Sequence, residues 1–210
     1  MSMIIKSLVK GQAKWFLPFY LFTFLLLFSC SEESTEEDEY ANWEERNDAM
    51  TNQWASNSSL RKIKCYTKDQ TTTGANSDYV YVEVLEEGSG TESPLFTDSV
   101  WMAYRGRLIP TTSYPDGLVF DQTYTNDFSW RTADMTKGSA GSFIEGFTTA
   151  LMNMHRGDHW RVHVPYQLGY GTSTSSSSVI PAYSDLTFDI ALLDFWHPGE
   201  SRPEFKARQE

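Results

Sequence analysis

Two groups of side chains in this sequence could carry conventional catalytic chemistry, and neither has the arrangement that such chemistry needs. His155, His159 and His163 are spaced by four residues, as metal ligands on one face of a helix would be. Gly157 interrupts that row and a strand-like alternation follows it, so the three imidazoles are not expected to meet at a metal ion. The serines of residues 172–178 form a low-complexity run without the Gly-x-Ser-x-Gly turn of a nucleophilic serine. The sequence therefore disfavours both metal-dependent and hydrolytic chemistry.

Residues 157–195 have instead the pattern of two half-buried strands separated by an aromatic loop. In the first run, Trp160, Val162 and Val164 share one face. In the second run the shared face consists of Leu186, Phe188, Ile190 and Leu192. Tyrosines, glycines and a proline lie between the runs, and these residue types suit a loop that covers a pocket.

This stretch resembles the C-terminal half of the FKBP-type peptidyl-prolyl isomerases. The pattern of that family is a strand, P-x-x-x-Y-G, a loop, I-P-P and a last strand of the type L-x-F-x-V-x-L. The corresponding segments here are Pro165 with Tyr170-Gly171, Val179-Ile180-Pro181, and residues 186–192. The sequence departs from the pattern by one extra residue before Tyr170 and by Ala182 in place of the second proline.

Further matches occur upstream in the order of the family. Residues 79–90 resemble its opening strand and G-x-G, and residues 98–108 resemble its V-x-V-x-Y-x-G-x-L strand. Phe120-Asp121 resembles its F-D pair, and residues 128–130 resemble its F-x-F strand. Residues 142–155 are a predicted helix that resembles V-I-x-G-W-x-x-x-L-x-x-M-x-x-G, with Phe147 in place of the commoner tryptophan. The resemblance covers about residues 80–195.

The resemblance also implies a site. Its catalytic residues would be Tyr104, Asp121, Ile144 and Tyr170. The backbone N–H of Ile144 would hold the substrate carbonyl that follows proline, the Tyr170 hydroxyl would be a second donor, and Asp121 would face the twisted amide or orient neighbouring tyrosines. The side chains that bind the substrate would be Phe120, Phe128, Phe143, Phe147, Ile180 and Phe188, with Phe147 as the floor. The alternative interpretation is that these aromatic side chains only form the hydrophobic core.

Charge is distributed unevenly along the chain. The net charge is -11, and residues 31–50 alone hold nine acidic residues against one arginine. The remaining sequence has no basic patch that could meet phosphates, which argues against a nucleic acid as partner.

Residues 1–29 have the features of a lipoprotein signal peptide. Three lysines precede an uncharged run of 14 residues, Trp15 to Phe28, which is short for a membrane-spanning helix of about 20 residues. The run ends in Leu-Phe-Ser-Cys and resembles a bacterial lipobox, so we expect Cys30 to be lipidated and to attach the chain to a membrane. The alternative is an uncleaved signal anchor.

Residues 30–39 are expected to be an acidic disordered tether, because they contain almost nothing apolar to bury. An acidic run after the cysteine also resembles the surface-export signal of Bacteroidetes lipoproteins. The chain is therefore predicted to be an outer-membrane lipoprotein that faces either the cell surface or the periplasm.

Residues 40–78 are predicted to form an accessory segment that begins with a helix at 40–56. Trp43, Met50 and Trp54 recur there at helical spacing and should pack on the chain's own domain, although a partner-binding face is an alternative. A short strand is expected within residues 60–70, with Cys65 as a small buried apolar residue.

These features together predict an α+β fold, a curved antiparallel sheet of about five to six strands wrapped around one short helix. The FKBP-like domain would span residues 79–196, followed by a polar tail at 197–210. The predicted function is a peptidyl-prolyl cis-trans isomerase that uses no cofactor or metal and assists the folding of exported proteins. Its expected partners are prolyl segments of those proteins, with a macrolide as a further candidate ligand. The alternatives are a non-catalytic prolyl-peptide binding module and a surface interaction protein that uses the aromatic helix.

Overall fold

The computed structural model describes residues 39–174 and 179–201. The predicted signal peptide, the lipidation site Cys30 and most of the acidic tether lie outside the described residues, as does most of the polar tail. Within the described ranges, no helix has both the length and the apolar character needed to cross a bilayer.

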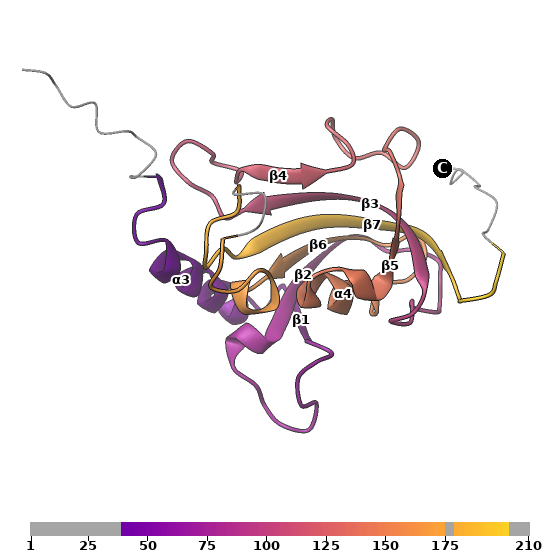
Figure 1. The fold of residues 1–210 in the computed structure, drawn as a ribbon, viewed down its shortest axis with the longest axis horizontal. Helices are drawn as coiled ribbons and strands as arrows, with labels where there is room; N and C mark the ends of the chain where they lie inside the picture. The colour runs from indigo at the N-terminus through magenta and orange to yellow at the C-terminus, as the bar shows by residue number, and fades with distance from the viewer. Residues whose placement is uncertain (1–38, 175–178, 202–210) are drawn as a thin grey trace, which may run out of the picture. The chain divides into compact units, whose positions relative to one another are not determined.

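In the described part of the chain, seven strands form one antiparallel sheet, one more than the upper end of the prediction. The strands are β1 (Arg61–Lys64), β2 (Tyr79–Glu86), β3 (Ser99–Leu108), β4 (Val119–Gln122), β5 (Thr136–Ser139), β6 (His159–Val164) and β7 (Leu186–Trp196). Their order is β1-β2-β6-β7-β3-β4, and Figure 1 shows it from β1 at the bottom to β4 at the top. Strand β5 pairs with the first half of β3 and β4 with its second half, while β7 takes the other edge of β3.

Helix α4 (Glu145–Leu151) lies against one face of this sheet. Gly146 makes the close approach possible, because a Cβ at that position would lie 2.3 Å from a methyl group of Val164 on β6. The alternation predicted for β6 is present, since Trp160, Val162 and Val164 are buried. The helix is shorter than the predicted range of 142–155, and a single turn of 3-10 helix at Ala140–Ser142 precedes it.

Helix α3 (Trp43–Ser56) covers the opposite face of β2 and β6. The indole of Trp54 stacks on the imidazole of His163 with 4.7 Å between ring centroids, and it also contacts the ring of Tyr81. Tyr81 and His163 alternate along their strands with Val82 and Val162, which point to the side of α4. The predicted helix therefore forms and buries both of its tryptophans on its own chain.

The accessory segment also contributes a strand to the sheet. Strand β1 pairs with β2 over four residues, from Arg61 opposite Val82 to Lys64 opposite Tyr79. Cys65 follows it and is fully buried, as expected for a small apolar residue. Because β1 lies before residue 79 and pairs with β2 after it, the boundary expected at residue 79 does not divide the sheet.

The F-x-F strand predicted at residues 128–130 is wrong. These residues are irregular, and the strand that precedes the helix is β5, which lies further along the chain. The physical reason is that the rings of Phe128 and Trp130 pack against side chains of β6 and β2 instead of extending as a strand. The ring of Phe128 lies 4.2 Å from that of His159, and the Trp130 indole N–H donates to Glu86 at 2.8 Å.

Candidate functional site

A cluster of aromatic rings fills the space between α4 and the sheet, and Phe147 lies at its centre. Its ring centroid is 5.8 Å from Tyr104 of β3, 4.8 Å from Phe143 and 5.0 Å from Phe188 of β7. Phe120 of β4 joins through an edge contact of 5.6 Å with Phe188. Phe147 is only 2% exposed, whereas Tyr104, Phe120 and Phe143 are half-buried. Phe147 is thus a buried ring in contact with partly accessible ones, and we call these five residues the Phe147 cluster.

Two glycines on the strands make room for the Phe147 cluster. A Cβ at Gly106 of β3 would lie 2.6 Å from the ring of Phe120 and 2.8 Å from that of Phe188. A Cβ at Gly138 of β5 would lie 2.6 Å from the ring of Phe143. All three distances are shorter than real contacts allow, so only glycine at these two positions leaves room for the rings in their present places. The sequence pattern included Gly106 but carried no signal for Gly138.

A polar pair that joins the middle of β3 to β4 adjoins the aromatic rings. The Tyr104 hydroxyl donates to Oδ2 of Asp121 at 2.6 Å, a short bond to a charged acceptor. The register of β3 and β4, with Gly106 opposite Asp121, places the carboxylate there. Burial and this hydrogen bond raise the pKa of Tyr104 well above its usual value. The phenol therefore stays protonated at neutral pH and keeps the carboxylate oriented.

Tyr170 lies within electrostatic range of the same group. Its pKa is raised first by burial and then by the charge of Asp121. Tyr170 is 44% exposed, so the residue is accessible to a ligand from solvent. The structure thus brings together Tyr104, Asp121 and Tyr170, although they are distant in sequence.

The two isoleucines of the predicted site lie on the segments around the Phe147 cluster. Ile144 is the N-cap residue of α4, and its carbonyl accepts the N–H of Thr148 at 3.0 Å. Ile144 is half-buried, and it directly follows Phe143 of the Phe147 cluster in the sequence. Ile180 is 3% exposed and belongs to the hydrophobic core, where it anchors the segment that leads into β7.

Phe128 is not brought to the Phe147 cluster. Its ring packs between Tyr124 at 5.4 Å, Trp130 at 5.0 Å and His159 at 4.2 Å. His159 points away from α4, because it alternates with the buried Trp160 along β6. Phe128 therefore covers the other face of the sheet, and no periodic pattern in residues 123–131 could have indicated that face.

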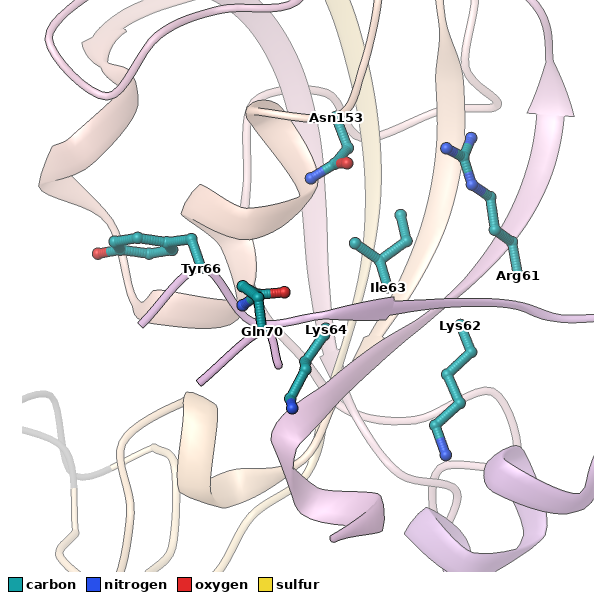
Figure 2. A pocket seen from close by; sticks show the side chains of 7 residues that line it. All are labelled: Arg61, Lys62, Ile63, Lys64, Tyr66, Gln70 and Asn153. Carbon is teal, nitrogen blue, oxygen red and sulfur yellow. The ribbon is translucent and has the colours of Figure 1, made fainter. Parts of the chain in front are cut away.

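A separate hollow of about 500 Å³ lies along β1 and is lined by Arg61, Lys62, Ile63, Lys64, Tyr66, Gln70 and Asn153 (Figure 2). Polar side chains that line this hollow make hydrogen bonds to other residues of the chain. The Lys64 ammonium donates to the carbonyls of Asp69 and Thr72, and the amide of Asn153 donates to the carbonyl of Thr149. Lysines are common on edge strands such as β1, where they discourage pairing with other chains. The hollow is therefore a weaker candidate than the Phe147 cluster.

The sequence matches known proteins over the part that forms this site. The family of FKBP-type peptidyl-prolyl cis-trans isomerases matches residues 90–193. The macrophage infectivity potentiator of Trypanosoma cruzi is 36% identical over 118 residues, which are 56% of this chain and 54% of that protein. The FKBP-type peptidyl-prolyl cis-trans isomerase FkpA of Escherichia coli K12 is 32% identical over 150 residues, 68% of this chain and 48% of that protein. The chain spans about half the length of these relatives.

Solved structures show the same fold. A peptidyl-prolyl cis-trans isomerase from Pseudomonas syringae pv. tomato superposes with a TM-score of 0.55 at 22% identity, covering 74% of this chain and 95% of that one. FkpA from Escherichia coli superposes with a TM-score of 0.54 at 24% identity, covering 85% of this chain and 71% of that one. At these identities the similarity concerns the fold alone.

Proposed function

Residues 90–193 form a domain of the FKBP-type peptidyl-prolyl cis-trans isomerase family, and from this premise we propose that the chain isomerises prolyl peptide bonds at the Phe147 cluster. The observation that carries the proposal is the short hydrogen bond from Tyr104 to Asp121, made beside a floor of aromatic rings. Core packing alone requires no carboxylate at that place.

The reaction needs no nucleophile or metal. Rotation about an amide bond has a barrier of about 18–20 kcal/mol because the C–N bond has partial double-bond character. The planar amide is more dipolar than the twisted one, so an apolar aromatic pocket removes solvation that favours the planar ground state. An acceleration of about a thousandfold requires roughly 4 kcal/mol of preference for the twisted form.

The polar groups at the rim would supply the rest of that preference. The Tyr104 hydroxyl donates its hydrogen bond to Asp121, so it would orient the carboxylate rather than the substrate. The Tyr170 hydroxyl and the backbone N–H of Ile144 would hold the substrate carbonyl that follows proline. Asp121 is exposed and would face the twisted amide.

Isomerisation of a prolyl peptide by the purified chain tests this proposal. We expect Asp121→Ala and Tyr170→Phe each to lower kcat/KM about tenfold, the effect of one lost hydrogen bond in the transition state, while the fold persists. Phe128→Ala is a matched aromatic control from the other face of the sheet and should leave kcat/KM near the wild-type value. A folded wild-type protein that binds prolyl peptides without isomerising them would establish the non-catalytic binding module instead.

We also propose that the protein acts outside the cytoplasm as a lipoprotein attached through Cys30, where its substrates would be prolyl segments of exported proteins. The support is the order of basic, apolar and Leu-Phe-Ser-Cys segments in the sequence. The mass of the mature N-terminus tests the lipid, and an unmodified, uncleaved terminus would refute it. Competition by a macrolide for the peptide site would identify the further candidate ligand.

A further inference from the structure

Helix α3 makes direct, buried hydrogen bonds to the two residues that precede β7. The Trp43 indole N–H donates to Oγ of Ser184 at 2.8 Å, and the Asp185 backbone N–H donates to Oδ1 of Asn47 at 2.8 Å. The Thr51 hydroxyl donates to Oδ2 of Asp185 at 2.8 Å. The three helix residues are four apart, so they form one stripe of α3 facing this segment.

The segment held by α3 is connected in turn to Pro181 and to Gly171, the residue that follows Tyr170. The Ser184 hydroxyl donates to the carbonyl of Pro181 at 2.7 Å, which links α3 to the Ile180-Pro181 pair. The Tyr183 N–H donates to the carbonyl of Gly171 at 3.0 Å. Because Gly171 follows Tyr170 directly, this bond ties the tyrosine of the site to the segment that α3 holds.

Asp185 provides a second connection to Gly171, through Tyr166. Its Oδ1 accepts the N–H of Tyr166 at 2.8 Å, and the carbonyl of Tyr166 accepts the N–H of Gly171 at 2.8 Å. One carboxylate thus joins α3, the start of the Tyr170 segment and the start of β7. Asp185 and Asn47 are fully buried, so water cannot replace either partner without opening the contact.

The conformation of this segment also needs support. Tyr183 has φ of 61°, in the left-handed region that side chains other than glycine rarely adopt. Such a conformation persists where surrounding contacts hold it. Here the contacts are the bond to Gly171 and the neighbouring Ser184 and Asp185, both held by α3.

We propose that α3 is a positioning element of the isomerase site: through Thr51, Asn47 and Trp43 it sets the place of Tyr170 and of Ile180-Pro181 relative to the Phe147 cluster. The inference rests on the proposed function, and it extends the functional unit beyond residues 90–193, which contain no part of α3. Residues that touch no substrate would then influence how substrate is held.

Thr51 offers the sharpest test, because its hydroxyl can be removed with little change of shape. Thr51→Val deletes the donor to Asp185, Thr51→Ser restores it, and Gln53→Ala alters an exposed position of the same helix. Hydrogen exchange in the full chain should show the Gly171 and Tyr183 amides exchanging about tenfold faster in Thr51→Val than in wild type, relative to the β6 amides. Thr51→Ser and Gln53→Ala should match wild type.

Kinetics then show whether that placement matters for the reaction. Thr51→Val should lower kcat/KM several-fold in the wild-type background and have little further effect in a Tyr170→Phe background, since the hydroxyl it positions is already absent. Equal effects in both backgrounds would overturn the proposal, as would unchanged exchange at both amides or faster exchange with unchanged kcat/KM.

The two proposals fail separately. An inactive but folded wild-type protein refutes isomerisation, and the exchange rates of the Gly171 and Tyr183 amides still decide whether α3 holds the segment. An active wild-type protein in which Thr51→Val changes neither exchange nor kinetics keeps the isomerase function and removes the role of α3.

Discussion

Replacing His163 by phenylalanine should change how the stability of this protein depends on pH. The imidazole is half-buried under the indole of Trp54, and its Nδ1 lies 2.9 Å from the hydroxyl of Thr187. Burial, together with the nearby charge of Arg161, lowers the pKa of His163 from 6.5 to about 4, although Asp189 opposes the shift. The folded protein therefore keeps this histidine neutral where the unfolded chain would protonate it.

The sign and size of the effect follow from that difference. Between pH 6.5 and about 4, the unfolded chain binds a proton that the folded chain does not. The stability contributed by His163 is fully present above pH 6.5 and is lost as the pH falls through this window. The difference between a pKa of 6.5 and one of about 4 corresponds to about 3 kcal/mol.

Asp185 contributes a slope of the opposite sign over nearly the same range. Burial raises its pKa from 3.8 to about 7, against the hydrogen bonds from Thr51 and Tyr166 that favour the charged form. The folded chain keeps a proton that the unfolded chain releases, so stability falls as the pH rises from 3.8 to about 7. The loss is about 4 kcal/mol. In the wild-type protein, the pH dependence of stability from His163 should therefore nearly cancel that from Asp185.

Urea unfolding from about pH 4 to about pH 7 tests this balance. Relative to wild type, His163→Phe should lose about 3 kcal/mol of its stability as the pH rises from 4 to 6.5, because the slope of Asp185 is no longer opposed. Asp185→Asn should show the reverse, gaining stability over the same range. Parallel curves for His163→Phe and wild type would refute the burial of a neutral imidazole.

Two further predictions concern the Phe147 cluster. Phe147→Ala removes the buried floor and should lower the free energy of unfolding by about 3–5 kcal/mol in urea denaturation, with loss of isomerase activity; a loss below about 1 kcal/mol would show that the ring is not buried as described. Gly106→Ala should destabilise the protein by about 1–3 kcal/mol, because the new methyl group would lie 2.6 Å from the ring of Phe120. An unchanged melting temperature for that variant would mean that the ring moves aside freely.

The strands could be predicted because the pattern that marks them lies in residues adjacent in the sequence. Side chains on a strand alternate between two faces, so the apolar residues Trp160, Val162 and Val164 mark both the strand and its buried side. Helix α3 was predictable for the same reason, since Trp43 and Trp54 recur at helical spacing and both are buried. The order of the FKBP-like motifs then indicated how such strands and the helix are assembled.

Only the tertiary structure decided which distant residues meet. Tyr104 and Asp121 share a hydrogen bond because β3 and β4 pair in one register, and a shift of one residue would turn the carboxylate to the other face. Phe128 lies in an irregular segment without a period, so nothing local could show that its ring covers the face opposite α4. The bond from Thr51 to Asp185 spans 134 residues, and a contact of that range depends on the path of the whole chain between its two ends.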